Sequence, residues 1–322
     1  MKTRWAVPVS LLPNELFSTW LVRAALSQGC DPLVLTGELW PRWRVWTRDP
    51  DRGLSDEHLS ALTVVSGIKS ATFQLATLRP TAVAVTQTPI ANLAIWPWVL
   101  AFGSRNRKRH GGLQYCPYCL QEDKTPYFRL EWRLAWHTTC PIHEVLLMDR
   151  CHICSAPLEP HRLLADAGHL AVCATCKADL RKCAVKDSSI EALAFQRVAD
   201  EILESRKALS NDGVESVGGW FDRARILLRI FRRTAHEGSS STGLVMELLP
   251  VGDRARLLAG IWRNINNDHE RSLSIPKQFK ARIKRSESHV STMRGHTNRP
   301  RSRAVVLRMF ARLQRRILVS VR

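Results

Sequence analysis

Apolar residues near the N-terminus recur every three to four positions. The stripe lies between Glu15 and Gln28 and comprises Leu16, Phe17, Trp20, Leu21, Ala24 and Ala25. A period close to 3.6 residues predicts an amphipathic helix. Asn14 is a candidate N-cap, because its side chain can accept a hydrogen bond from a free N–H group, and Gly29 is a candidate stop. We therefore predict a first helix over residues 15–28.

A second pattern, from Ser55 to Leu78, predicts two helices joined by a tight turn. Ser55 precedes two acids, an apolar face follows, Gly67 interrupts it, and Ser70 is a candidate cap for a second helix over residues 70–78. Helix, glycine-containing turn and helix is the order of a helix-turn-helix. Its groove contacts are usually made near the start of the second helix, where Lys69, Thr72 and Gln74 stand. Many α-hairpins share this pattern, so a structural or protein-binding role stays open.

The fold class that we expect is mainly α with a small β component. We divide the chain into an N-terminal helical, helix-turn-helix-like domain (1–110), a cysteine-rich module (111–186), a C-terminal helical region (187–270) and a basic tail (271–322). No repeat of 20–50 residues covers the chain, which disfavours a solenoid. Between Leu39 and Trp46, tryptophans alternate with arginines. Core filling is the leading interpretation of these tryptophans and base stacking is the alternative.

The net charge of +19 is concentrated at the C-terminus. Residues 271–322 contain 15 basic side chains and a single acid, Glu287, which gives +14. A tail of this kind usually contacts phosphate, and a solvated tail with no specific ligand is the alternative. Another basic run precedes the cysteines and adds four candidate DNA or partner contacts: Arg105, Arg107, Lys108 and Arg109.

The N-terminus lacks the apolar core of a signal peptide, and the longest apolar stretch, residues 82–102, is broken by polar residues and two prolines. We therefore expect a cytoplasmic, nucleoid-associated protein without a membrane span. In a reducing compartment, nine cysteines suggest metal before disulfide.

Eight of the Cys and His residues form four pairs, each with two residues between its members. The pairs are Cys116 and Cys119, Cys140 and His143, Cys151 and Cys154, and Cys173 and Cys176. Two such chelating turns about twenty residues apart close a tetrahedral shell, which predicts one Cys₃His and one Cys₄ zinc site in tandem zinc ribbons. Sequential pairing needs only local closure and is favoured over an interleaved cross-brace. Redox, disulfide and iron–sulfur interpretations are weaker, since four regular pairs are more than a lone Cys-x-x-Cys.

Each predicted shell is complete, so neither zinc would keep an open position for activating water, and we expect two structural ions per chain. Cys30 and Cys183 fall outside both sets. The aromatic segment 126–137 is expected to pack around the first site, with Arg129 and Arg133 as an exposed subset that contacts nucleic acid or protein.

Several segments together resemble the TniQ/TnsD family of transposition proteins. They are Leu12–Arg23, Thr47–Arg52, Tyr115–Cys119, Tyr127–Arg133, Cys140–His143, and Leu147 with Cys151. The resemblance covers residues 5–180 well, 187–265 loosely and the tail not at all. It assigns zinc to the eight Cys and His positions and carries over no catalytic residue.

The resemblance implies a target-site selection adaptor that links target DNA, or a DNA-bound complex, to an AAA+ transposition ATPase of the TniB or TnsC type. Further implied partners are double-stranded DNA, a CRISPR effector complex, a resolution-site protein and a second copy of the chain. The alternative is an autonomous zinc-containing transcription regulator that reads an operator with the 55–78 hairpin. An enzyme is the weakest hypothesis, since no phosphate-binding Gly-x-x-x-x-Gly-Lys-Ser/Thr loop is present.

Overall fold

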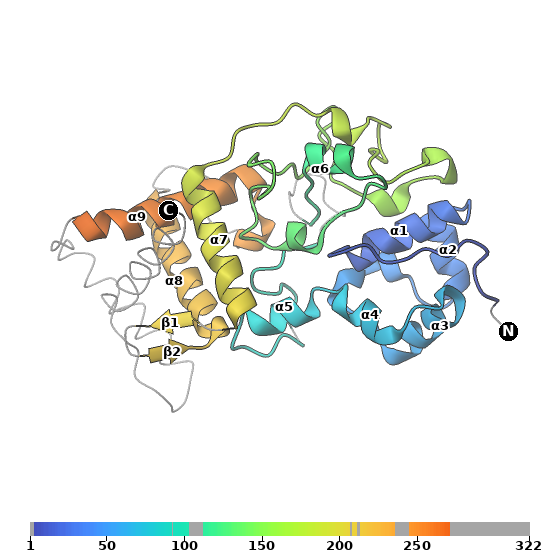
Figure 1. Ribbon diagram of the computed structural model, residues 1–322, viewed down its shortest axis with the longest axis horizontal. Helices are drawn as coiled ribbons and strands as arrows, with labels where there is room; N and C mark the ends of the chain where they lie inside the picture. Colours follow the sequence, from blue (N-terminus) through green and yellow to red (C-terminus); the bar gives the residue numbers. More distant parts are fainter. Residues whose placement is uncertain are drawn as a thin grey trace.

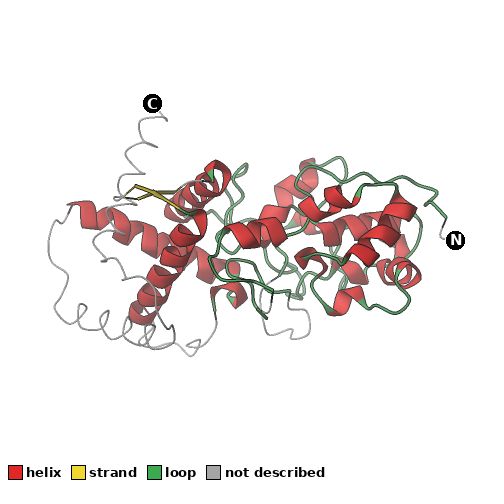
Figure 2. Cartoon of the chain, turned by 90° about the horizontal axis from the view of Figure 1, so that it is seen from below, coloured by secondary structure: helices red, strands yellow, loops and turns green. Residues whose placement is uncertain are grey.

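The computed structural model describes residues 3–91, 93–102, 112–206, 208–210, 213–235 and 245–270. These residues form an elongated, mainly helical molecule in which helices α1–α4 lie at one end, helices α7–α9 lie at the other, and the cysteine-rich region bridges them (Figure 1, Figure 2). The basic run Arg105, Arg107, Lys108 and Arg109 and the tail 271–322 lie outside the described residues.

The helices are α1 (Phe17–Ser27), α2 (Pro32–Leu39), α3 (Asp56–Ser66), α4 (Ser70–Leu75), α5 (Arg79–Ala84), α6 (Pro117–Glu122), α7 (Ile190–Ser205), α8 (Val217–Ala235) and α9 (Val251–Glu270). One antiparallel hairpin, β1 (Ala208–Ser210) with β2 (Gly213–Glu215), pairs Ala208 with Glu215. The expected mainly α fold with little strand is confirmed. No helix among the described residues has the length and apolar character needed to span a bilayer.

The first helix begins two residues later than the sequence pattern predicts. Asn14 adopts a left-handed conformation with φ of 53° and does not cap the helix, whose N-cap is Leu16. The cap is supplied from a distant loop, because Asp51 accepts hydrogen bonds from both the backbone N–H and the hydroxyl of Ser18, at 2.7 and 2.8 Å. Gly29, with φ of 73°, follows the helix end as predicted.

Helices α3 and α4 form the expected hairpin, with a shorter second helix. Ser55 caps α3, and Gly67 ends it with φ of 73° while its N–H donates to the Thr63 carbonyl. Lys69, and not Ser70, is the N-cap of α4, which has only six residues. The prediction of one helix over residues 70–78 was wrong, because the chain turns after Leu75 and Leu78 becomes the N-cap of α5.

Two hydrophobic cores are present in the described residues, and α1 contributes to both. The N-terminal core, from Phe17 to Phe73, surrounds Trp20 between α1–α4. The second core, from Leu16 to Trp262, is continuous through the cysteine-rich region and α7–α9. Its centre is aromatic, with Trp98 packed edge-on against Trp136 and Phe221 at ring-centre distances of 6.0 and 5.4 Å.

One tryptophan of the 39–46 loop is buried and the other two are half-buried against neighbouring rings, which agrees with the core-filling interpretation. Trp40 is buried, and Trp43 packs on His58 with ring centres 3.9 Å apart. Trp46 stacks on His161 of the cysteine-rich region at 5.1 Å. This last contact joins the N-terminal helices to the segment between the third and fourth chelating turns.

Candidate metal centres

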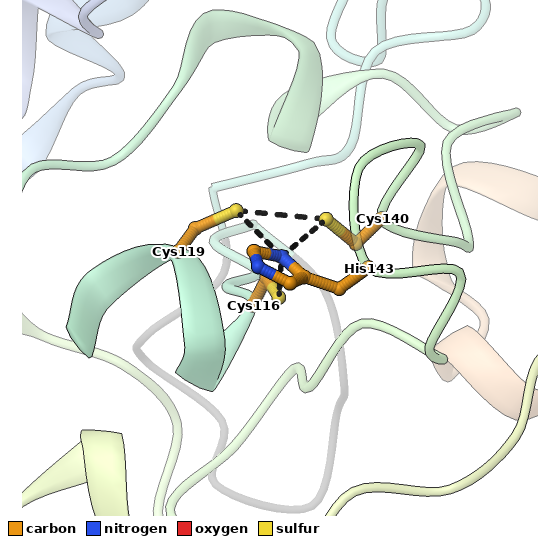
Figure 3. Close-up of side chains that lie close together, drawn as sticks. All are labelled: Cys116, Cys119, Cys140 and His143. Atoms are coloured by element: carbon orange, nitrogen blue, oxygen red, sulfur yellow. Dashed lines mark hydrogen bonds between the residues drawn. The ribbon is translucent and has the colours of Figure 1, made fainter. Parts of the chain in front are cut away.

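The structure brings the eight predicted ligands into two groups, and the grouping is the sequential one. Cys116, Cys119, Cys140 and His143 form the first centre. Cys151, Cys154, Cys173 and Cys176 form the second. Within each centre the four ligand atoms lie within 4.8 Å of one another. Figure 3 shows the first centre, where three sulfur atoms and the His143 ring converge from α6 and the following loop.

The distances in the first centre fit a tetrahedral zinc ion. The Nδ1 atom of His143 lies 3.5, 3.4 and 3.5 Å from the sulfurs of Cys116, Cys119 and Cys140. The sulfurs of Cys119 and Cys140 are 3.5 Å apart. With Zn–S of about 2.3 Å and Zn–N of about 2.0–2.1 Å, tetrahedral geometry places two sulfurs about 3.8 Å apart and sulfur about 3.6 Å from nitrogen.

The second centre has the same spacing with four sulfurs. Cys151 and Cys176 are 3.6 Å apart, and Cys154 and Cys173 are 3.7 Å apart. A disulfide would bring two sulfurs to about 2.05 Å. The donor set therefore suits a shared cation, and both centres could hold one zinc ion each.

Three of the four chelating turns share one backbone conformation. In each, the N–H of the first cysteine donates to the carbonyl five residues later, and the residue four positions after that cysteine has φ between 53° and 62° and donates back to the cysteine carbonyl. The turns begin at Cys140, Cys151 and Cys173, with Glu144, Ser155 and Lys177 as the positive-φ residues.

The remaining turn is helical, since Cys116 caps α6 and Cys119 lies within it. An antiparallel bridge flanks each of the three non-helical turns: Thr139 with Leu146, Arg150 with Pro157, and Val172 with Asp179. These bridges are too short to form strands, so the ribbon architecture that we expected stays a prediction.

A carboxylate outside the ligand set orients His143. Its Nε2 atom lies 2.9 Å from the Glu122 carboxylate, while Nδ1 faces the sulfurs. Such a partner fixes the ring and favours the tautomer in which Nδ1 is free to bind a metal. The spacing rule did not find Glu122, although its position three residues after Cys119 on α6 was a possible signal.

The pKa values of two thiols in the first centre are shifted in opposite directions. The pKa of Cys140 is lowered, because its thiolate accepts hydrogen bonds from Cys116 and Cys119. The pKa of Cys119 is raised, because its thiol hydrogen-bonds to Cys116 and Cys140 and is also buried. A metal ion binds the three cysteines as thiolates, so its binding releases protons from the thiols. The affinity of the first centre for the ion therefore falls as the pH is lowered.

Arg133 is fully buried, contrary to the exposure that we expected. Its guanidinium donates to Asp49 at 2.6 Å, to Asp51 at 2.7 Å and to the Leu100 carbonyl at 2.8 Å. Both Arg133 and Asp51 have side-chain exposure of 0%. Asp51 in turn caps α1, so this network connects the N-terminal core to the cysteine-rich region and leaves Arg133 no surface for a partner.

Arg129 is also largely enclosed. It pairs with Asp123 at 2.8 Å, its side chain is 12% exposed, and its guanidinium lies over the rings of Tyr127 and Trp132. By contrast, Lys69, Thr72 and Gln74 are all exposed on or beside α4. The structure therefore separates the predicted contact residues into an exposed group at α4 and a packed pair in the aromatic segment.

Comparison with known proteins identifies a domain within the chain. The family model described as TniQ matches residues 6–147. No curated protein is significantly similar to the chain. The match includes α1, the Asp49–Asp51 loop and the whole first metal centre, and it ends before the second centre. Proteins with this domain are associated with transposition. Residues 6–147 therefore form a TniQ domain.

Proposed function

We propose that this protein is a target-site selection adaptor, which links target DNA or a DNA-bound complex to an AAA+ transposition ATPase of the TniB or TnsC type. The observation that carries the proposal is the TniQ domain over residues 6–147, with the motifs of the family at the centre of the fold. An adaptor needs two surfaces held at a fixed separation. The elongated shape, with a helical group at either end of a cross-linked middle, supports that use (Figure 1).

The metal centres support rigid presentation, not chemistry. Each centre has four protein ligands, and a filled tetrahedral shell leaves no position for a substrate or water. We propose zinc for both, one ion per centre, since three thiolates with one imidazole and four thiolates are both donor sets of structural zinc sites. When bound, zinc supplies four fixed bonds that cross-link turns distant in sequence. The chain then acts through binding, as an adaptor and not as an enzyme.

The target is chosen either by this chain itself or by a partner that it binds. The three exposed candidates at α4, Lys69, Thr72 and Gln74, supply too few base contacts to select one site in a genome. We propose that a partner supplies the remaining specificity: a CRISPR effector complex, a resolution-site protein or a second copy of this chain. Footprinting with the purified protein alone tests this, because partner dependence predicts diffuse protection. A discrete site abolished by Lys69→Ala and Gln74→Ala would contradict it.

The adaptor function is tested by recruitment. The purified zinc-loaded chain, an AAA+ transposition ATPase of the TniB or TnsC type, ATP and labelled target DNA are combined. The ATPase retained on DNA is measured with and without the chain. We expect retention to depend on the chain. If the ATPase is retained equally without it, or never retained with any target complex, the adaptor proposal is wrong. A transcription regulator would instead bind one site alone and need no ATPase.

A further inference from the structure

The first residues of the chain form an arm that is fixed to the N-terminal helices. The N–H of Trp5 donates to the Val65 carbonyl near the end of α3, at 2.9 Å. The Gln28 side chain pairs with both backbone groups of Val7, at 3.1 and 2.7 Å. These contacts hold residues 5–7 on either side, so the side chain of the preceding residue, Arg4, has a defined location.

Arg4 lies directly against Gly67 in the turn between α3 and α4. A Cβ atom on Gly67 would stand 1.9 Å from Nη2 of Arg4, which no real contact allows. Gly67 also has φ of 73°, a conformation in which residues other than Gly, Asn and Asp are strained. The glycine therefore has two roles, since it permits the turn and it leaves room for the guanidinium of the arm.

The segment that contains Gly67, α4 and the start of α5 has basic residues and no acids. Lys69 caps α4 and Arg79 begins α5; both are exposed, as is Arg4, and none of the three forms an ion pair with a described residue. No acidic residue occurs between Glu57 and Glu122 in the sequence. Glu57 itself is at the opposite end of α3 from Gly67, roughly 14 Å away at 1.5 Å per residue.

We infer that Arg4, Lys69 and Arg79 form a phosphate-binding surface for duplex DNA around α4, in which the N-terminal arm supplies a contact beside the helix. Arg4 lies at the turn before α4, Lys69 is the N-cap of α4 and Arg79 begins the next helix. Thr72 and Gln74 of α4 are exposed and can donate and accept hydrogen bonds. Phosphate contacts of this kind fix the register of a helix on DNA, and base edges are then read by the helix. This inference rests on the proposed action at target DNA, and it identifies which surface of the chain meets the duplex.

The salt dependence of DNA binding tests the role of Arg4. The full zinc-loaded chain is titrated with a fluorescent duplex of mixed sequence between about 50 and 200 mM salt, where the slope of log affinity against log salt counts the phosphates neutralised. Arg4→Ala should lower the magnitude of the slope by about 1 and weaken binding several-fold. Lys124→Ala is the matched control, because Lys124 is exposed and comes two residues after the end of α6. Helix α6 lies away from α3 and α4 (Figure 1). Lys124→Ala should leave the slope unchanged.

A double-mutant cycle with Gly67 tests the contact itself. Asn tolerates positive φ, so Gly67→Asn keeps the turn while its Cβ displaces Arg4. We expect Gly67→Asn to weaken binding as much as Arg4→Ala does, and the double variant to be no weaker than either single variant. Equal melting temperatures of all variants show that the fold is kept. Additive losses, or an unchanged slope in Arg4→Ala, would overturn the inference.

Further outcomes distinguish a DNA-binding surface from a surface for an acidic protein, and failure of this surface from failure of the adaptor proposal. If binding of poly-glutamate depends on Arg4 while DNA binding does not, the surface is for an acidic protein and the inference is wrong. If Arg4→Ala loses the phosphate contact but the wild-type chain does not recruit the ATPase, the DNA surface stands and the adaptor proposal fails. If recruitment occurs and Arg4→Ala binds DNA as wild type, only the surface assigned here is wrong.

Discussion

The two metal centres share one kind of chelating turn, but the first centre also includes the helical turn of α6, and the two centres differ in burial. In the first centre all three cysteines are buried, and Glu122 orients the histidine. In the second centre Cys154 and Cys176 are exposed, and the ligands are four sulfurs. Within each pair the ligands are separated by two residues in both centres, and the gap between the pairs is twenty residues in the first centre and eighteen in the second. The two centres differ more in how much of the hydrophobic core surrounds the ligands. Loss of the metal ion is therefore expected to have a larger effect at the first centre than at the second.

The largest effect is expected from removing a ligand of the buried centre. Cys119→Ser should leave one metal ion per chain and abolish the cooperative unfolding of the second core. Structural zinc binds zinc-finger peptides by about 10–16 kcal/mol, which exceeds the net stability of about 5–15 kcal/mol of a typical protein. Metal content by mass spectrometry and a circular dichroism melt measure both quantities.

Cys183→Ser is the matched control for that experiment. Cys183 is a buried cysteine outside both centres, and its thiol donates a hydrogen bond to the Ala184 carbonyl. The variant should keep two ions and a cooperative melt. Retention of two ions by Cys119→Ser would refute the ligand assignment.

Removing a ligand of the exposed centre should have a smaller, local effect. Cys154→Ser is expected to lose one ion while the second core still unfolds cooperatively at a modestly lower temperature, because Cys154 lies at the surface. Amide hydrogen exchange should increase in residues 151–183 and remain low in α7 and α1. If Cys154→Ser loses cooperative unfolding as completely as Cys119→Ser does, the prediction that the exposed centre contributes less to stability is wrong.

Acid should act on the contact between the second centre and the N-terminal helices. Burial and the nearby Arg162 lower the pKa of His161 from 6.5 to about 4. The folded state therefore binds fewer protons than the unfolded state between these values. Stability is fully present above pH 6.5 and falls as the pH approaches 4, by up to about 3 kcal/mol at 1.36 kcal/mol per pKa unit.

His161→Phe retains a ring on Trp46 and removes this titration. We expect the free energy of unfolding of the variant to change less than that of wild type between pH 7 and pH 4.5 or so. Protonation of the metal ligands is common to both proteins and cancels in the difference. Equal pH dependence in the two proteins would mean that folding does not lower the pKa of His161.

The smallest effect is expected outside the ligand sets. Glu122→Gln keeps a hydrogen-bond acceptor near His143 and removes the charge, so the first centre should bind zinc about 10-fold more weakly, at the low end for such partners because Glu122 is largely exposed. Competition with a chromophoric chelator measures this. Glu144→Gln is the control, since Glu144 follows His143 directly and pairs with Arg197 instead. An effect of equal size in the control would exclude orientation by Glu122.

The sequence allowed the two ligand groups to be predicted because their geometry is local. A Cys-x-x-Cys turn fixes both ligands within one turn of chain, and a second turn nearby completes the shell. Ser55 and Gly67 were correctly placed for the same reason, as capping depends on adjacent residues. The mainly helical fold followed from periodicity alone.

Long-range contacts could not be predicted in this way. Arg133 was expected to be exposed, because nothing near it in sequence reveals Asp49 and Asp51, which stand more than eighty residues earlier. The cap of α1 was assigned to Asn14 because Asp51 is remote for the same reason. The approach of Arg4 to Gly67 is a third case. In each, the chemistry of one side chain is decided by a partner that only the tertiary fold supplies.

The buried network of Arg133, Asp49 and Asp51 constrains how new target selectors could be assembled from existing ones. The arginine lies after the first chelating turn, whereas both carboxylates lie in the N-terminal helical segment. A recombinant that takes these two parts from different parents would leave a charge in the core without its partner, at a cost of about 3–5 kcal/mol. Chimeras that change target preference must therefore inherit the three residues together, and exchange is freest at surface segments that this network does not join.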